Sequence, residues 1–292
     1  MHLSLLKNRI VPHAALSPLA LFVLIGYIGS VLWTFKISLT NSRTLPTDTF
    51  VGLEQYSRLF NNERWMASLD HFALYGVLFI AASIVLGGLL AVFIDRKVRA
   101  EGVLRTVFLY PYAMSFVATG VVWQWILTPG NGLDRIARQV GISGFSFDWL
   151  VDQDLVMYAI VIATVWQSAG LVMALLLAGL RGIDDEIWQA ARIDGIPVWR
   201  VYVSIVVPML WSHIATAFLL LCTGAIKLYD AVVAMTQGGP GIASEVPAKF
   251  VMDHLFGRGN IALASAGAIM LLVPVVGLLT LYVYASNRKR YA

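Results

Sequence analysis

Residues 155–180 read LVMYAIVIATVWQSAGLVMALLLAGL, an unbroken run without Asp, Glu, Lys or Arg. A helix of this length extends about 39 Å at 1.5 Å per residue, which exceeds the roughly 30 Å of hydrocarbon in a bilayer. Buried helices of soluble proteins rarely stay uncharged over such a length. The run therefore predicts a transmembrane helix.

Five further stretches have the same property. All 38 charged residues fall in the tails and loops between the six stretches, and the other five lie at about 15–35, 71–94, 107–127, 201–226 and 261–285. Charged residues make up 13% of the 292, whereas a soluble domain carries about a quarter. We expect an all-α, polytopic membrane protein with six transmembrane helices, forming a single membrane domain over residues 1–292.

The distribution of Lys and Arg predicts the orientation. The N-terminal tail, the second and fourth loops and the C-terminal tail hold 12 basic residues in roughly fifty positions, and the other three loops hold 9 in roughly a hundred. Because cytoplasmic segments carry the excess of basic residues, both termini are predicted to be cytoplasmic. The C-terminal tail would be anchored there by Arg288, Lys289 and Arg290. This bias also accounts for the basic pI without a nucleic-acid partner.

Several classes of protein are disfavoured by what the stretches lack. Ion-coupled carriers generally need ionisable groups inside the bilayer, and His213 is the candidate here. A lone histidine at that depth is more often a hydrogen-bonded packing residue. No inverted repeat or broken-helix pair is evident. The chain also lacks a Gly-x-x-x-x-Gly-Lys-[Ser/Thr] phosphate loop and the motifs of intramembrane proteases, so we expect a non-catalytic subunit.

The loop at 181–200 differs from the others. Asp184 and Asp185 suit the cap and first turn of a short helix. Its apolar positions would be Ile187, Ala190, Ala191 and Ile193. Gly195 can adopt the positive φ of a helix stop, and Pro197 can open a second helix that runs into the fifth stretch. Two interpretations stay open: an interfacial helix leading into the next span, or a cytoplasmic knob that fits a partner's groove.

This loop resembles the "EAA" loop of ABC-importer permeases. The family pattern is Glu-Ala-Ala, three residues, Gly, nine residues, Ile and then Leu-Pro, and Gly195, Ile205 and Pro208 fall in register with it. The departures are Gln189 for the family's Glu and Val207 for its Leu. Gln189 keeps the length of the side chain but loses its charge, so it would not form a salt bridge that the family's Glu could form at this position.

Further segments resemble the carbohydrate-uptake subfamily, with its maltose-type and glycerol-phosphate-type systems. They follow in the expected order as Phe50–Tyr56 (FVGLEQY), Tyr110-Pro111-Tyr112, Trp123-x-Trp125 with Pro129–Leu133, and Tyr229-Asp230 with Thr236–Pro240 (TQGGP). The resemblance implies a type I importer permease in a bacterial inner membrane, with a core over 71–285 (spans 2–6). Its substrate would be a sugar or sugar derivative. One alternative is an ABC permease with the same knob that carries a non-sugar solute. The other, which fits the pattern less well, is a secondary carrier.

The resemblance also implies partners and a docking site. The partners are a second homologous permease, two cytoplasmic ATPase subunits that hold ATP and Mg, a periplasmic solute-binding protein and the membrane lipid, and this chain would hold no cofactor. The coupling loop, residues 181–200, would dock the ATPase through Glu186, Gln189, Ala190, Ala191, Asp194, Gly195 and Pro197.

A polar path for a sugar needs amide and hydroxyl groups and flat aromatic faces. The candidate residues are Trp123, Gln124, Trp166, Gln167, Tyr229 and Asp230. An amide at membrane depth prefers the interior of a helix bundle to lipid. The alternative is that Gln124 and Gln167 bridge helices, while the tryptophans pack or lie at the headgroups.

Overall fold

The computed structural model describes residues 16–96, 98–142 and 146–288; Lys289 and Arg290 of the basic C-terminal tail lie outside these ranges. Within them, regular secondary structure is helical apart from one isolated antiparallel bridge between Thr40 and Phe50. The prediction of an all-α protein is therefore confirmed.

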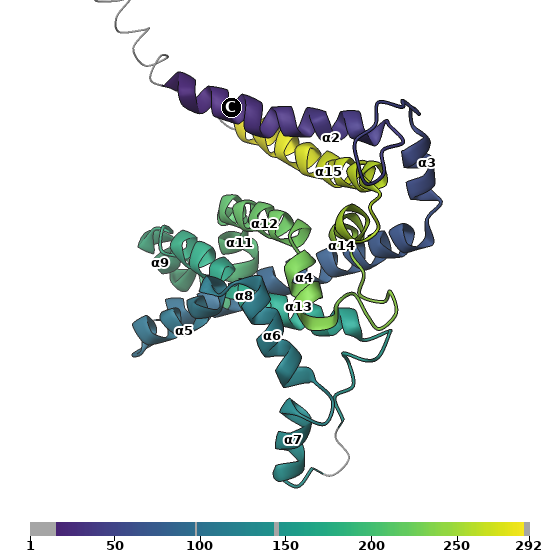
Figure 1. Ribbon diagram of the computed structural model, residues 1–292. Helices are drawn as coiled ribbons and strands as arrows, with labels where there is room; N and C mark the ends of the chain where they lie inside the picture. The colour runs from purple at the N-terminus through teal and green to yellow at the C-terminus, as the bar shows by residue number, and fades with distance from the viewer. Residues whose placement is uncertain (1–15, 97, 143–145, 289–292) are drawn as a thin grey trace, which may run out of the picture. The chain divides into compact units, whose positions relative to one another are not determined.

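The chain divides into two compact units, residues 1–63 with 250–292 and residues 64–249. In the first unit, η1 (Leu24–Gly29) continues into α2 (Ser30–Ser38), and α15 (Ile261–Arg288) packs against α2 and α3 (Glu54–Phe60) (Figure 1). The described part of this unit also contains η3 (Asp253–Gly257).

The FVGLEQY segment forms a turn followed by the first residues of a short helix. Gly52 takes a φ of +61° just before α3. The buried Gln55 amide donates a hydrogen bond to the Thr40 carbonyl oxygen at 3.0 Å. The Tyr56 and Ser38 hydroxyls lie 2.8 Å apart. These bonds fasten the start of α3 to the end of α2.

The second unit is built around α8 (Val156–Leu180). Most of α8 is buried, and its neighbours include α5 (Glu101–Ala113), α6 (Phe116–Leu127) and α12 (Trp211–Ile226). A Cβ at Gly170 would overlap with the carbonyl oxygen of Phe108, so this glycine allows α5 to approach α8 closely. The unit also contains α4 (Glu63–Asp95), α7 (Gly132–Gln139), α9 (Asp185–Ile193), α10 (Val198–Val201), η2 (Tyr202–Val206), α11 (Val207–Met209) and α13 (Tyr229–Thr236); α14 (Pro247–Met252) begins at its end.

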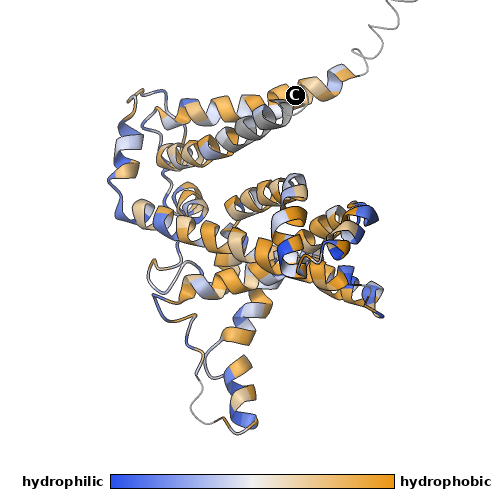
Figure 2. Cartoon of the chain, turned by 180° about the vertical axis from the view of Figure 1, so that it is seen from behind, coloured by the Kyte–Doolittle hydropathy of each residue, from blue (hydrophilic) through white to orange (hydrophobic). Residues whose placement is uncertain are grey.

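Apolar residues run along the long helices, whereas polar residues gather at helix ends and in loops (Figure 2). Three helices of the described part are long and apolar enough to cross a membrane, at Leu16–Ser38, Glu63–Asp95 and Val156–Leu180. Two bent pairs pass the same test together, at Glu101–Ala113 with Phe116–Gln139 and at Val198–Met209 with Trp211–Ile226. The described residues thus contain three to five candidate spans, and Ile261–Gly277 is a shorter apolar helix.

The bent pairs correct the expectation that the chain contains no broken-helix pair. The third stretch breaks at Met114, with a bend of 101°, because Ser115 caps α6 by accepting a hydrogen bond from the Ala118 N–H at 3.1 Å. The fifth bends by 71° at Leu210, which lies two residues after Pro208 and has a non-helical ψ of 2°. Uncharged Ser and Pro do not interrupt a hydrophobic stretch, so the sequence pattern concealed both breaks.

Candidate functional site

Helix α9 begins where the sequence predicts. Asp184 occupies the N-cap position, and Asp185 and Glu186 lie in the first turn, where the partial positive charge of the helix terminus favours carboxylates. The Asp184 side chain makes no capping hydrogen bond. Its contribution to α9 is therefore electrostatic and conformational.

A Schellman motif ends α9. Gly195 has a φ of +66° and its N–H donates to the Arg192 carbonyl oxygen at 3.2 Å, while the Ile196 N–H donates to the Ala191 carbonyl oxygen at 3.0 Å. These two bonds define the motif, and Gly is preferred because its φ is positive. Pro197 is then the N-cap of α10. The predicted stop and restart are confirmed, and backbone bonds fix the turn between the two helices.

The inner face of α9 differs from the predicted one. Ala191 is buried, Trp188 is half-buried, and the Trp188 and Tyr202 rings lie 5.6 Å apart. Ile193 was expected on this apolar face but is 86% exposed. It follows Ala191 by two residues, or about 200° around the helix, so it faces outward. Trp188 was not among the predicted residues, although its spacing from Ala191 is that of one helix face.

The residues predicted to dock the ATPase lie together on this loop. Six of these residues are at least partly exposed, as a docking surface requires: Glu186, Gln189, Ala190, Asp194, Gly195 and Pro197. Ala191 is the exception, because it is 5% exposed and packs into the apolar core of the second unit. In this conformation Ala191 supports the loop from inside.

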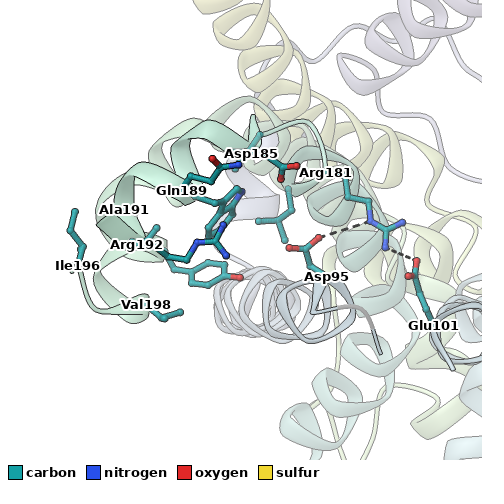
Figure 3. Close-up of a pocket in the computed structure, with 14 residues that line it drawn as sticks. Asp95, Glu101, Arg181, Asp185, Gln189, Ala191, Arg192, Ile196 and Val198 are labelled. Atoms are coloured by element: carbon teal, nitrogen blue, oxygen red, sulfur yellow. Dashed lines mark hydrogen bonds and ion pairs between the residues drawn. The ribbon is translucent and has the colours of Figure 1, made fainter. Parts of the chain in front are cut away.

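A cavity of about 800 Å³ lies under α9 and α10. Figure 3 shows Arg181, at the end of α8, between Asp95 and Glu101. One Arg181 amino group donates to Glu101 Oε1 at 2.5 Å, and Arg181 Nε lies 4.0 Å from Asp95 Oδ1. Asp185 and Arg192 also line the cavity. Arg181 thereby connects the end of α4 and the start of α5 with the helix that leads into the coupling loop.

The substrate-path candidates are distributed over three helices of the second unit. Trp123 and Gln124 lie on α6, Trp166 and Gln167 on α8, and Tyr229 and Asp230 at the start of α13, which packs against α6. The rings of Trp123 and Trp166 make an edge-to-face contact with centroids 5.8 Å apart. Gln124 and Tyr229 are half-buried, and Asp230 is exposed. The structure thus brings the two tryptophans together.

Gln167 bridges two segments, as the alternative interpretation has it. Its Nε2 donates to the Met114 carbonyl oxygen at 2.8 Å, at the break between α5 and α6. The side chain is 2% exposed, and its Oε1 has no hydrogen-bond partner among the described residues. An unsatisfied buried amide oxygen is costly, so Gln167 retains an acceptor for a further donor. The bridging and path-lining roles are compatible.

His213 packs against α8. A Cβ added at Gly179 would lie 2.8 Å from the His213 Nδ1, so the glycine makes room for the ring. This agrees with a packing role, although Nδ1 has no hydrogen-bond partner in the described part of the chain. In the same residues no group of three His, Cys, Asp or Glu side chains could hold a metal ion.

Comparison with known proteins identifies the family. The family described as "Binding-protein-dependent transport system inner membrane component" matches residues 83–291. The chain belongs to this family. The resemblance of the chain to ABC-importer permeases is thereby confirmed, and the protein is an inner membrane component of a transport system.

Permeases related to this chain align with it over nearly its whole length. A probable ABC transporter permease of Pyrococcus horikoshii is 35% identical over 95% of this chain and 96% of its own. The trehalose/maltose transport system permease MalF of Thermococcus litoralis is 30% identical over 94% of this chain and 92% of its own. A chain of a bacterial ABC transporter that imports the acidic polysaccharide alginate has the same fold, with a TM-score of 0.81 at 16% identity over 100% of this chain and 99% of that one.

Proposed function

We propose that this permease translocates a sugar or sugar derivative across the inner membrane, with energy from a separate ATPase subunit. The observation that carries the proposal is the coupling loop, which is exposed, fixed in shape and in register with the EAA pattern at Gly195. The names of relatives support the substrate class, because they include the trehalose/maltose permease, a xylose/arabinose import permease and an sn-glycerol-3-phosphate permease.

The proposed topology has six spans and two cytoplasmic termini within one membrane domain, residues 1–292. Three continuous helices and two bent pairs account for five spans. The sixth is α15, whose 28 residues extend about 42 Å. We assign spans 2–6, residues 71–285, as the transport core. The basic residues in the even-numbered loops and tails support this orientation.

In the proposed mechanism, the coupling loop docks in a groove of the ATPase and moves with it. A flexible loop would absorb that displacement, whereas the Schellman turn at Gly195 passes it from α9 to α10. The displacement then reaches α8, α4 and α5 through the inward packing of Trp188 and Ala191 and through the ion pairs of Arg181. The ATPase subunits hold ATP and Mg, and this chain needs no cofactor for its role.

The proposed complex contains a second homologous permease, two ATPase subunits and a periplasmic solute-binding protein, surrounded by lipid. The related alginate transporter has been solved in complex with an alginate pentasaccharide-bound periplasmic protein, which supports the last of these partners. Sugar would pass by the paired rings of Trp123 and Trp166, with the free Gln167 Oε1 accepting a hydroxyl hydrogen bond. Gln124, Tyr229 and Asp230 complete the proposed path.

The test is purification of the tagged chain from membranes, followed by reconstitution. We expect an ATPase with a phosphate loop to co-purify, and labelled sugar uptake in vesicles to require ATP. Uptake by the single purified chain, driven by a proton or sodium gradient, would contradict the proposal. ATP-dependent uptake of an amino acid or inorganic phosphate, but of no sugar, would support the importer function and contradict the proposed substrate class.

A further inference from the structure

The segment from 237 to 246, between α13 and α14, has a fixed shape. The hydroxyl oxygens of Thr236 and Ser244 lie 2.7 Å apart, and the buried Ser244 hydroxyl also donates to the Gly239 carbonyl oxygen at 2.7 Å. The Ser244 N–H donates to the Gly238 carbonyl oxygen at 3.3 Å. We call residues 237–246 the outer loop, since the proposed topology places it on the periplasmic side.

A bidentate ion pair fastens the outer loop to the start of α4. Arg64 Nε donates to Glu245 Oε2 at 2.8 Å, and an Arg64 amino group donates to Oε1 at 2.6 Å. The Glu245 side chain is 2% exposed and the Arg64 side chain 25%. His71, two turns further along α4, places Nδ1 3.1 Å from the Glu245 carbonyl oxygen, which accepts this hydrogen bond. Both attachments join segments that are far apart in sequence.

Stability alone is a poor explanation for this ion pair. Removing a carboxylate from water is costly, and replacing a buried ion pair by apolar side chains is often neutral or stabilising. A bidentate arginine–carboxylate pair, however, fixes both the distance and the orientation of the groups that it joins. The pair therefore sets the position of the outer loop on α4.

The opposite end of α4 reaches the cavity beneath the coupling loop. Helix α4 is continuous over 33 residues, about 50 Å along its axis. Its last residue, Asp95, lines the cavity beneath α9 and lies 4.0 Å from Arg181 Nε. One helix thus joins the outer loop to the residues that support the coupling loop.

We propose that Arg64 is a positioning residue that makes the outer loop and α4 move as one body. Displacements then pass along α4 between the outer loop and the coupling loop. The partner that displaces the loop is the periplasmic binding protein, and the inference in this respect rests on the proposed function. The Arg64–Glu245 pair is the joint, and Asp95 with Arg181 is the contact at the other end.

The test follows the outer loop while nucleotide binds on the other side. In the full transporter with its co-purified ATPase, Cys222 is replaced by Ser and a spin label is placed at the exposed Ile242. The probe is Mg-ATP with vanadate, and the readout is the mobility of the label. We expect a nucleotide-dependent change in the otherwise unaltered chain and its reduction by about fivefold or more in Arg64→Ala.

Two further variants separate positioning from folding. Glu245→Gln keeps the shape of the side chain and removes only its charge, so it tests the joint even where Arg64→Ala fails to insert. The exchange Arg64→Glu with Glu245→Arg should restore part of the response. Arg58→Ala is the matched control, because Arg58 pairs with Glu54 on an exposed surface at 2.5 Å, and it should leave the response unchanged.

The outcomes distinguish the two proposals. A nucleotide response that persists in both Arg64→Ala and Glu245→Gln would overturn the role of Arg64 and leave the proposed function intact. Absence of a co-purifying ATPase from the parent chain would instead overturn the proposed function.

Discussion

The coupling loop and the proposed substrate path differ in what determines their geometry. In the coupling loop, Gly195 and Pro197 fix the backbone through neighbours in sequence, and the side chains that would meet a partner point outward. In the path, Trp123, Trp166 and Gln167 are positioned by contacts between helices distant in sequence. Substitutions in the loop should therefore alter attachment of the ATPase, whereas substitutions in the path should alter transport with the ATPase still bound.

Gly195→Asp should have the largest effect. A side chain at a φ of +66° strains the backbone by about 1–2 kcal/mol, too little to unfold a membrane bundle but enough to displace the knob. We expect a membrane-inserted protein that loses uptake and binds its ATPase weakly, measured by co-purification and uptake.

Gly141→Asp is the control for this substitution. Gly141 has a φ of +90° and, like Gly195, open space where a Cβ would lie, with no neighbouring atom within 4 Å, but it is outside the coupling loop. It should retain uptake. Normal transport by Gly195→Asp with its ATPase bound would show that the loop is only a connector.

Gln167→Leu tests the other side of the comparison. It removes the part-buried hydrogen bond to the Met114 carbonyl oxygen, and a lost hydrogen bond of this kind costs about 0.5–1.5 kcal/mol. We expect uptake to fall about tenfold or more while the ATPase still co-purifies. Gln139→Leu, at an exposed site, is the control. Loss of ATPase binding in Gln167→Leu would remove the distinction between the two regions.

Arg181→Ala should have a smaller effect on coupling. Its side chain is 43% exposed, and exposed ion pairs contribute about 0–1 kcal/mol, so we expect uptake to fall a few-fold. The difference in uptake between the parent chain and Arg181→Ala should decrease as ionic strength rises, because salt screens the ion pairs. Lys36→Ala, which breaks the exposed pair with Asp48, is the control for a general loss of charge. A loss of uptake as large as that of Gly195→Asp would assign Arg181 a direct role in docking.

Gln189→Glu should have the smallest effect. It restores the family's residue at a position that borders the charged cavity beneath α9. We expect ATPase co-purification and uptake close to those of the parent chain. A strong loss of either would show that this permease and its ATPase depend on the neutral amide.

The sequence predicted what local chemistry determines. The helix start at Asp184, the stop at Gly195 and the restart at Pro197 each follow from a preference of one residue for a backbone conformation. Ile193 was placed wrongly because amphipathic spacing in a helix of nine residues leaves its orientation underdetermined. Burial of Trp188 under the loop then fixed the orientation.

The breaks in the third and fifth hydrophobic stretches were not predictable from charge and hydropathy. Ser115 caps a helix without interrupting the apolar run, and the bend at Leu210 follows a proline that the pattern accommodates inside a span. The hydrogen bond from Gln167 to Met114 depends on the tertiary approach of α8 to the first of these breaks. The number of hydrophobic stretches could be counted from the sequence, but their paths depend on packing.

The Schellman turn also bears on how such loops evolve. Its two hydrogen bonds join backbone groups, so its shape makes few demands on side chains other than at Gly195. Under the proposed docking, outward positions such as Glu186, Gln189 and Ala190 could therefore change to suit an altered ATPase surface while the loop keeps its form. Separating shape from recognition in this way would let one ATPase lineage be exchanged among permeases that carry different solutes.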